Sequence, residues 1–302
     1  MRPSGAQYAI RHGEQVAVAV EVGGGLRTYT AGDRDVLDGY AEDAVCDGAR
    51  CQTLVPWPNR VQDGKWHWDG GEQQLALTEP EQHNAIHGLV RWLAWEVVTH
   101  TDDTVVLACE CAPQPGYPWR LAVTNTWSLD AGGLTAVTTI RNESDSVAPI
   151  AAGFHPYVTA GTPRIDEASL RVPGATRILT GEQQIPVGRE DVTGTPYDFR
   201  EARMLGDLEI DYAFTDLVRD ADGLARLRLA APEGDAVTVW VDESYRYLEV
   251  FTGDALPDPS RRRRGLGVEP MTAPPNALAT GEDLVRLEPG GQWQGRWGVV
   301  PA

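Results

Sequence analysis

Short runs of alternating apolar and polar residues recur along almost the whole sequence, and turn residues separate them. Such period-two runs are typical of half-buried β-strands, and neighbouring runs joined by a tight turn predict hairpins. Four turns are predicted, at residues 69–70, 102–103, 131–133 and 233–234, and a closing strand is expected in GGQWQGRWGVV. Helical periodicity is hard to find. The pattern therefore predicts an all-β fold, a large antiparallel β-sandwich, rather than a doubly wound fold.

The length of 302 residues allows one large domain or two smaller ones. No repeat of fixed period and no long linker divides the sequence. We therefore expect a single β-sandwich domain over residues 1–302.

The net charge is −18, and this field repels nucleic acid and anionic membrane surfaces. No stretch approaches the roughly 18 apolar residues of a membrane span, and the first residues lack the apolar core of a signal peptide. We expect a cytoplasmic protein that binds a small neutral or cationic ligand, as a monomer or homodimer, with no nucleic acid and no membrane as partner.

The four cysteines, Cys46, Cys51, Cys109 and Cys111, form no C-x-x-C pair. Cys109 and Cys111 alternate onto one strand face, which favours buried free thiols over metal ligands. No zinc and no other metal is expected.

Several loops between the predicted strands carry polar and aromatic residues suited to chemistry. His87 precedes Gly88, and His155 lies between Phe154 and a proline. Histidine donates and accepts protons near neutral pH, although each of these histidines could also be structural. Glu269 stands in the apolar segment GVEPM, where burial would raise its pKa and make it a stronger base; its alternative is a turn carboxylate that caps a backbone N–H.

Three further residues could bind a ligand. Asp211 stands among apolar and aromatic residues, and Asn59 with Arg60 offers hydrogen-bond donors for vicinal hydroxyl groups or a carboxylate. A surface ion pair is the alternative for Arg60. The run from Arg261 to Arg264 could bind an anion, but its proline and glycine flanks favour a solvated, mobile loop.

Five of these segments, in this order, are PWPNRVQDGKW, AIHGLVRW with Trp95 beyond it, GFHPYV, DYAFTDL and EPMTAPPNAL. Together they resemble the aldose 1-epimerase (galactose mutarotase-like) family, from about Leu54 to the final strand. The resemblance implies a large antiparallel β-supersandwich, which agrees with the alternation pattern. It also implies an isomerase that opens and closes the ring of a monosaccharide without a cofactor.

The resemblance assigns roles to six residues. Glu269 would be the general base at the anomeric hydroxyl, His155 the general acid at the ring oxygen, and His87 its neighbour. Arg60, Asp211 and Asn59 would bind sugar hydroxyls. Opening a hemiacetal needs one proton removed at O1 and one supplied at O5, and a carboxylate with an imidazolium can do both.

Three alternatives remain. A hexose-6-phosphate 1-epimerase would need a basic cluster at the pocket, and the arginine run precedes Glu269 in sequence. A non-catalytic carbohydrate-binding sandwich would share the fold but have no use for a paired His155 and Glu269. A glycoside hydrolase would need two carboxyl groups that flank the scissile bond, for which Asp211 and Glu269 are the candidates.

Overall fold

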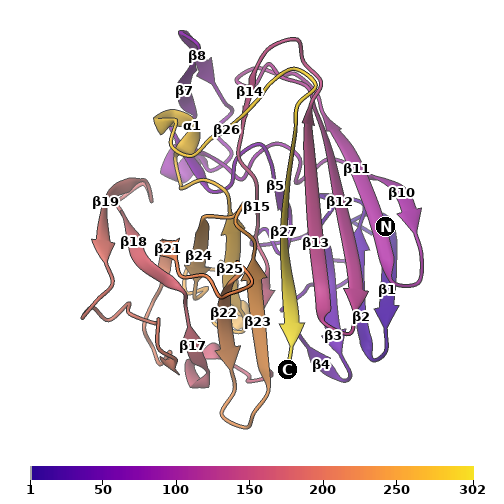
Figure 1. Cartoon of the computed structure of the whole chain (residues 1–302), viewed down its shortest axis with the longest axis vertical. Helices are drawn as coiled ribbons and strands as arrows, with labels where there is room; N and C mark the ends of the chain where they lie inside the picture. Colours follow the sequence, from indigo (N-terminus) through magenta and orange to yellow (C-terminus); the bar gives the residue numbers. More distant parts are fainter. Residues whose placement is uncertain (1) are drawn as a thin grey trace.

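The computed structural model describes residues 2–302 and is built almost entirely of antiparallel strands (Figure 1). Nine of them form the front sheet in Figure 1. In order across that sheet they are β10 (Glu96–His100), β11 (Thr104–Cys111), β12 (Leu121–Asp130), β13 (Gly133–Asn142), β27 (Gln292–Pro301), β23 (Ala236–Val241), β22 (Ala225–Ala230), β17 (Ser169–Arg171) and β20 (Arg203–Met204).

An eight-stranded sheet lies behind the front sheet. Its order is β19 (Pro186–Asp191), β18 (Gly174–Thr180), β21 (Asp211–Leu217), β24 (Tyr247–Phe251), β25 (Leu266–Met271), β15 (Gly153–Phe154) and β5 (Thr53–Leu54), with β16 (Tyr157–Val158) also paired to β25. A four-stranded sheet packs on β11 and β12, and consists of β1 (Gln7–His12), β2 (Gln15–Val20), β3 (Leu26–Ala31) and β4 (Arg34–Asp35).

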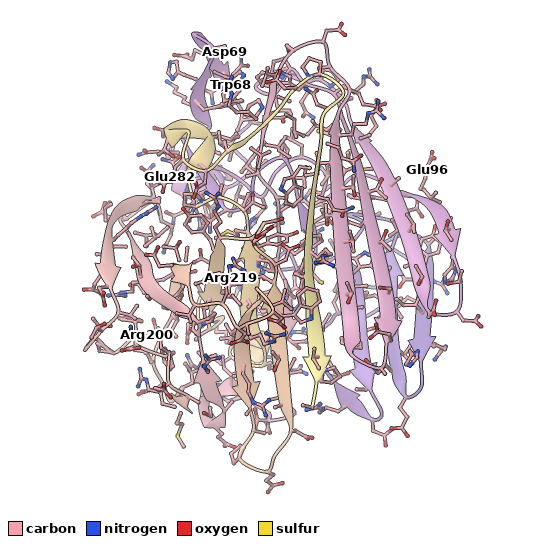
Figure 2. The ribbon with its side chains drawn as sticks, viewed as in Figure 1. Trp68, Asp69, Glu96, Arg200, Arg219 and Glu282 are labelled. Atoms are coloured by element: carbon pink, nitrogen blue, oxygen red, sulfur yellow. The ribbon has the colours of Figure 1, made fainter. Side chains whose placement is uncertain are left out.

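Three two-stranded ribbons complete the sheets: β6 (Arg60–Gln62) with β9 (Asn84–Ile86), β7 (Lys65–Trp68) with β8 (Gly71–Gln74), and β14 (Ala148–Ile150) with β26 (Val285–Leu287). The β7–β8 ribbon projects from one end of the molecule, where Figure 2 labels Trp68 and Asp69. Helical segments are short: α1 (Ala277–Thr280) and the 3₁₀ turns η1 (Pro80–Gln82), η2 (Ile165–Glu167) and η3 (Pro259–Arg261). Among residues 2–302, no helix has the length and apolar character needed to cross a bilayer.

The hairpins predicted from alternation are confirmed as β7–β8, β10–β11, β12–β13 and β22–β23, and the closing strand as β27. In β12 every second residue from Leu121 to Leu129 is buried, as expected for a strand with one face on a core. The all-β antiparallel prediction is therefore correct.

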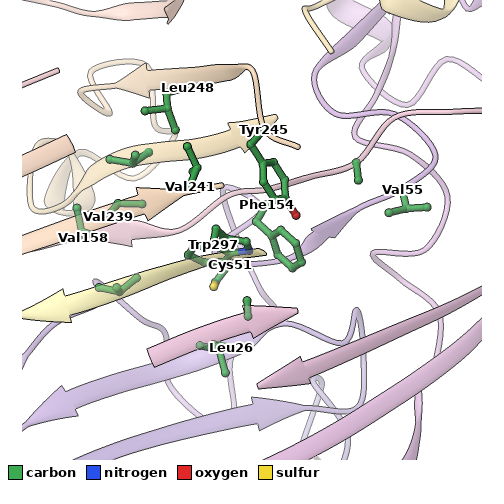
Figure 3. Packing of buried hydrophobic residues seen from close by; sticks show 14 of the residues in the cluster. Leu26, Cys51, Val55, Phe154, Val158, Val239, Val241, Tyr245, Leu248 and Trp297 are labelled. Carbon is green, nitrogen blue, oxygen red and sulfur yellow. The ribbon is translucent and has the colours of Figure 1, made fainter. Parts of the chain in front are cut away.

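The core lies between the sheets, and aromatic side chains join them (Figure 3). Phe154 of β15 packs against Trp127 of β12 at 5.5 Å and against Trp297 of β27 at 5.1 Å, measured between ring centres. The one polar inward residue of β12, Asn125, is satisfied by the hydroxyl groups of Thr138 and Thr53 at 2.8 and 2.7 Å. Strands β24 and β25 are buried along nearly their whole length, so their second face can form the floor of a site.

Candidate active site

A cavity of about 420 Å³ lies beside the central strands of the eight-stranded sheet, and all six residues predicted for the site line it. The rest of its wall comes from Glu79, Glu81, Gln82, Gln184, Phe251, Ala255 and Pro257. A larger cavity, of about 620 Å³, lies between Arg171 and Val218, and none of the six residues lines that one. Cavity size alone therefore does not locate the acid–base groups.

Carboxyl groups reach this site from three neighbouring strands. Glu249 in β24 is directly opposite Glu269 in β25, so the two side chains share one face of the sheet. Asp211 begins β21, and Ala213, two residues further, is the partner of Glu249. Residues two apart on a strand face the same side, so the strand register brings all three acids together.

His155 lies in the gap between β15 and β16, and both of these short strands pair with β25. Their pairing positions on β25 are Met271 and Gly267, so the gap faces Glu269. The Nε2 atom of His155 lies 3.1 Å from Oε1 of Glu269. The Nδ1 atom of His155 and Oε2 of Glu269 are buried and have no hydrogen-bond partner among residues 2–302. The described part of the protein therefore leaves one hydrogen-bonding atom of each side chain unsatisfied.

His87 follows β9 and adopts a left-handed backbone with φ +63°, as does Gly88 with φ +70°. A Cβ atom at Gly88 would lie 2.2 Å from the carbonyl oxygen of Val55, so only glycine fits this close approach. The backbone N–H of Asn59 donates to Nδ1 of His87 at 3.2 Å. This bond places the proton of the neutral ring on Nε2, and the two imidazole rings lie 5.3 Å apart.

Arg60 and Asn59 are both engaged within the protein. The Arg60 guanidinium forms a two-pronged ion pair with Glu79, with Nε–Oε2 at 2.8 Å and Nη2–Oε1 at 2.9 Å. The side-chain amide of Asn59 donates to Glu249 at 3.3 Å, and the oxygen of that amide accepts from the backbone N–H of Arg60 at 2.9 Å. Asn59 thus links His87 to the carboxyl groups of the floor.

Burial dominates the electrostatics of the acid–base pair. It raises the pKa of Glu269, and the nearby charge of Asp211 adds to this shift. Burial also lowers the pKa of His155, and it lowers that of His87 well below the ordinary range. From the sequence, a carboxylate paired with an imidazolium is expected at neutral pH. In the structure, these shifts favour a proton held by Glu269 and shared with His155 across the 3.1 Å contact.

The other two acids are shifted in the same direction. Burial raises the pKa of Asp211 to about 6, although the Arg60 cation opposes the shift. Burial, with Asp211 and Glu269 nearby, raises the pKa of Glu249 well above its ordinary value. The neutral form of Glu249 is therefore favoured by the same burial that raises the pKa of Glu269.

The same groups could also hold a cation. The ligand atoms of His87, His155 and Glu269 lie within 4.8 Å of one another, and two imidazoles with a carboxylate are a common zinc set. The expectation of a metal-free site is therefore open to direct test and stays a prediction.

Two residues of this site were not predicted from the sequence. Glu249 is an acid inside a strand that is otherwise apolar, YLEVF, and an unexplained charge in such a run is the signal that could have revealed it. Glu79 precedes the η1 turn and gives no local signal of its partnership with Arg60, which depends on the tertiary fold.

The prediction of a solvated, mobile loop is wrong for Arg261 and Arg263, whereas Arg262 and Arg264 are exposed as expected. Arg263 is only 5% exposed, and its guanidinium bonds Asp166, Asp254 at 3.0 Å and the carbonyl oxygen of Gly206 at 2.7 Å. Arg261 forms an ion pair with Asp38 at 3.0 Å. Acids from distant parts of the chain therefore hold Arg261 and Arg263 in place.

Comparison with known proteins places the chain in a family. The sequence pattern of the family described as Aldose 1-epimerase matches residues 6–299. The uncharacterized protein YihR of Escherichia coli (strain K12) is 30% identical over 291 residues, which cover 96% of this chain and 91% of that protein.

Solved structures show the same fold. The GalM/aldose epimerase homologue from C. elegans superposes with a TM-score of 0.86 at 17% identity, over 98% of each chain. Galactose 1-epimerase from Lactobacillus acidophilus NCFM superposes with a TM-score of 0.79 at 16% identity, over 97% of this chain and 92% of that one. The galactose mutarotase-like fold is therefore confirmed.

Proposed function

Because the chain belongs to the aldose 1-epimerase family, we propose that it interconverts the α and β anomers of a free aldose by opening and closing the sugar ring. The observation that carries this proposal is the buried contact of 3.1 Å between His155 Nε2 and Glu269 Oε1. The sugar atoms O1 and O5 are bonded to one carbon, so an acid and a base that serve both must lie close together. A histidine and a carboxyl group in contact at the cavity wall meet this requirement.

The reaction needs only protons. Transfer of the shared proton from Glu269 to His155 produces a carboxylate and an imidazolium. Glu269 then removes the proton of the anomeric hydroxyl while His155 protonates O5, and the C1–O5 bond breaks to give the open-chain aldehyde. Rotation about the C1–C2 bond presents the other carbonyl face to O5, and both protons return when the ring closes. Each well-placed group supplies about 10²–10⁴-fold.

The neighbours fit supporting roles. The Nε2–H of His87 is free to donate to the same region of the sugar, because Nδ1 of His87 accepts from Asn59. Arg60 and Asp211 also line the cavity and would orient the ring through its hydroxyl groups. Asn59, predicted to bind hydroxyls, is better suited to orient His87, because both ends of its amide are engaged within the protein.

A free aldose is favoured over its 6-phosphate. The alternative needs cations at the pocket, but no residue of the arginine run lines it. Arg60, the guanidinium at the wall, is already paired with Glu79, and the other charged groups of the wall are acids. A phosphate ester would therefore meet repulsion there.

Polarimetry of freshly dissolved α-aldoses tests the proposal. Wild-type protein should accelerate the optical rotation change of at least one free aldose. Glu269→Gln should lower kcat by about 10²-fold or more, because the shape stays and the base is lost, whereas calorimetry should still detect sugar binding. Normal turnover in Glu269→Gln would show that another group is the base. If the wild-type protein accelerates anomer exchange for none of the aldoses, the proposal is rejected.

Removal of metal tests whether the reaction needs a bound cation. We expect dialysis against a chelator to leave the rate of anomer exchange unchanged, with an untreated sample carried through the same buffer as control. A loss of activity that added zinc restores would show that His87, His155 and Glu269 hold a cation.

A further inference from the structure

The imidazole of His155 lacks the support that usually orients a catalytic histidine. Such a ring is normally fixed by a hydrogen bond at the nitrogen that does not face the reaction. His87 has this bond, from the backbone of Asn59. His155 does not, because its Nδ1 atom has no partner within the part of the chain that the structure describes. Another contact must therefore set the orientation of the His155 ring.

The flat face of His155 packs against Tyr157. The two rings are stacked, with centres 5.0 Å apart and planes inclined by 18°. The Tyr157 hydroxyl donates to the carbonyl oxygen of Gly48 at 3.1 Å, and the ring is buried. Tyr157 does not line the cavity itself; its face stacks on His155, and Phe251 of the cavity wall packs edge-on against it with ring centres 6.3 Å apart.

Arg50 packs on Tyr157 in turn. Its guanidinium carbon lies 4.8 Å from the centre of the Tyr157 ring, and the side chain is only 2% exposed. A buried cation over an aromatic ring attracts it and holds both in place. The next residue, Cys51, donates its backbone N–H to the carbonyl oxygen of His155 at 2.8 Å. This short segment therefore contacts the histidine through its backbone and through the ring stack.

Two acids fix the plane of the guanidinium. Asp38 accepts from Nε of Arg50 through its carbonyl oxygen at 3.1 Å and from Nη2 through its carboxylate at 3.4 Å. Asp47 pairs with Nη1 at 2.8 Å. The other carboxylate oxygen of Asp38 pairs with Arg261 at 3.0 Å, so the arginine run forms the outer end of this chain of contacts.

We propose that Arg50 and Tyr157 are positioning residues for the reaction proposed above: Arg50 clamps the Tyr157 ring, and this ring holds the His155 imidazole with Nε2 against Glu269. The inference rests on the proposed function, because it concerns the acid of that reaction. Neither residue touches the substrate. Small displacements of a catalytic group cost large factors in rate, so loss of the stack should lower kcat.

The charge of Arg50 adds a second effect on the same ring. Burial is the main cause that lowers the pKa of His155, and Arg50 lowers it further. The ionisable groups that surround this imidazole are His87, Glu269, Tyr157, Arg50, Arg91 and Arg60. Loss of the Arg50 cation alone should therefore raise the pKa of His155.

Two substitutions at Tyr157 distinguish the contribution of its ring to kcat from that of its hydroxyl group. Tyr157→Phe keeps the stacked ring, and we expect kcat within about 2-fold of wild type. Tyr157→Leu removes the ring, and we expect kcat to fall by about 10-fold or more with KM within about 3-fold, because the acid and not the binding is disturbed. Tyr117→Leu removes an equally buried tyrosine remote from the site and should keep kcat, which controls for loss of stability.

Arg50 is tested with two variants and a spectroscopic measurement. Arg50→Lys keeps the charge but loses the planar fork, so kcat should fall less than in Tyr157→Leu while the pH profile stays in place. Arg50→Gln removes the cation, so it should raise the pH at which the ¹⁵N resonances of His155 titrate. The titration of the wild-type protein, in which the cation is present, is the reference. If Arg50→Gln does not fold, Arg50→Lys and the tyrosine variants carry the test.

The outcomes are distinct. Wild-type kcat in Tyr157→Leu, or an equal loss in Tyr157→Phe, would overturn the inference, as would a change confined to KM. Absence of wild-type activity on any aldose would instead reject the proposed function. In that case the ¹⁵N resonances of His155 still decide the inference: Tyr157→Leu should shift them, and Tyr157→Phe should leave them in place.

Discussion

The arginine run and the floor of the cavity both bury ionisable side chains, but they neutralise them in different ways. Around Arg263, the positive charge meets Asp166 and Asp254 from other parts of the chain. On the floor, Glu249 and Glu269 lie side by side, and within residues 2–302 neither forms an ion pair with arginine or lysine. Burial raises the pKa of both acids there, which favours a bound proton over a charge without a counter-charge.

The paired charges of the arginine run therefore suit a role in stability, whereas the buried acids of the floor suit proton transfer. A paired charge is fixed and strengthens the fold only while both partners remain. A buried acid that keeps its proton can release it, which is what a base near neutral pH must do. Three substitutions test the comparison, in order of decreasing expected effect.

Arg263→Ser should have the largest effect on stability. It leaves Asp166 and Asp254 without their partner, and breaking a buried pair costs about 3–5 kcal/mol. We expect the free energy of unfolding to fall by about 3 kcal/mol, at the lower end of that range. The side chains of Asp166 and Asp254 are 29% and 26% exposed, so water can solvate them once the arginine is lost. Urea unfolding measures it. An unchanged midpoint would mean that the pairs contribute nothing.

Glu249→Gln should change how stability depends on pH. A raised pKa means that the folded protein keeps a proton that the unfolded chain releases, so this stabilisation is complete below about pH 4.5 and is lost as pH rises toward the folded value. Glutamine has no such loss. Because one pKa unit corresponds to about 1.4 kcal/mol, the variant should gain about 1 kcal/mol or more on wild type between pH 5 and pH 7.

Urea unfolding at both pH values measures this gain. Glu233→Gln, at the exposed β22–β23 turn, removes the same formal charge and serves as the control. A difference between Glu249→Gln and wild type that is the same at pH 5 and pH 7 would contradict a protonated Glu249.

Arg262→Ser should have the smallest effect. This residue belongs to the same run as Arg263 but is exposed, and its guanidinium bonds only the carbonyl oxygen of Leu256, at 2.8 Å, among the described residues. Exposed contacts of this kind contribute little, so we expect a change within about 0.5 kcal/mol by urea unfolding. A loss as large as that of Arg263→Ser would show that total charge, and not pairing, stabilises the run.

The strands could be predicted because alternation is local. Each half of the β12–β13 hairpin carries its own period-two signal, and the turn between them carries Gly132 and Gly133. The six residues of the cavity wall came from loop motifs and from a family resemblance. The structure places them together, but their roles in the reaction remain predictions.

What could not be predicted depends on partners far away in sequence. Asp166 is 97 residues from Arg263, so nothing near the arginine run indicates that it is paired. The position of Glu249 beside Glu269 depends on the register of two strands, which the letters YLEVF do not specify. The lowered pKa of His155 likewise depends on burial by the whole fold.

The attachment of His155 to strand β25 has a consequence for how new sugar preferences could arise. Both short strands that flank His155 pair with the strand that carries Glu269, so the sheet holds the proposed acid and the proposed base side by side. The outer rim of the cavity, at Gln82, Gln184 and Pro257, belongs to other segments. Exchange of these rim segments between relatives should therefore alter which aldose is accepted while the spacing of the two proton-transfer groups is inherited intact.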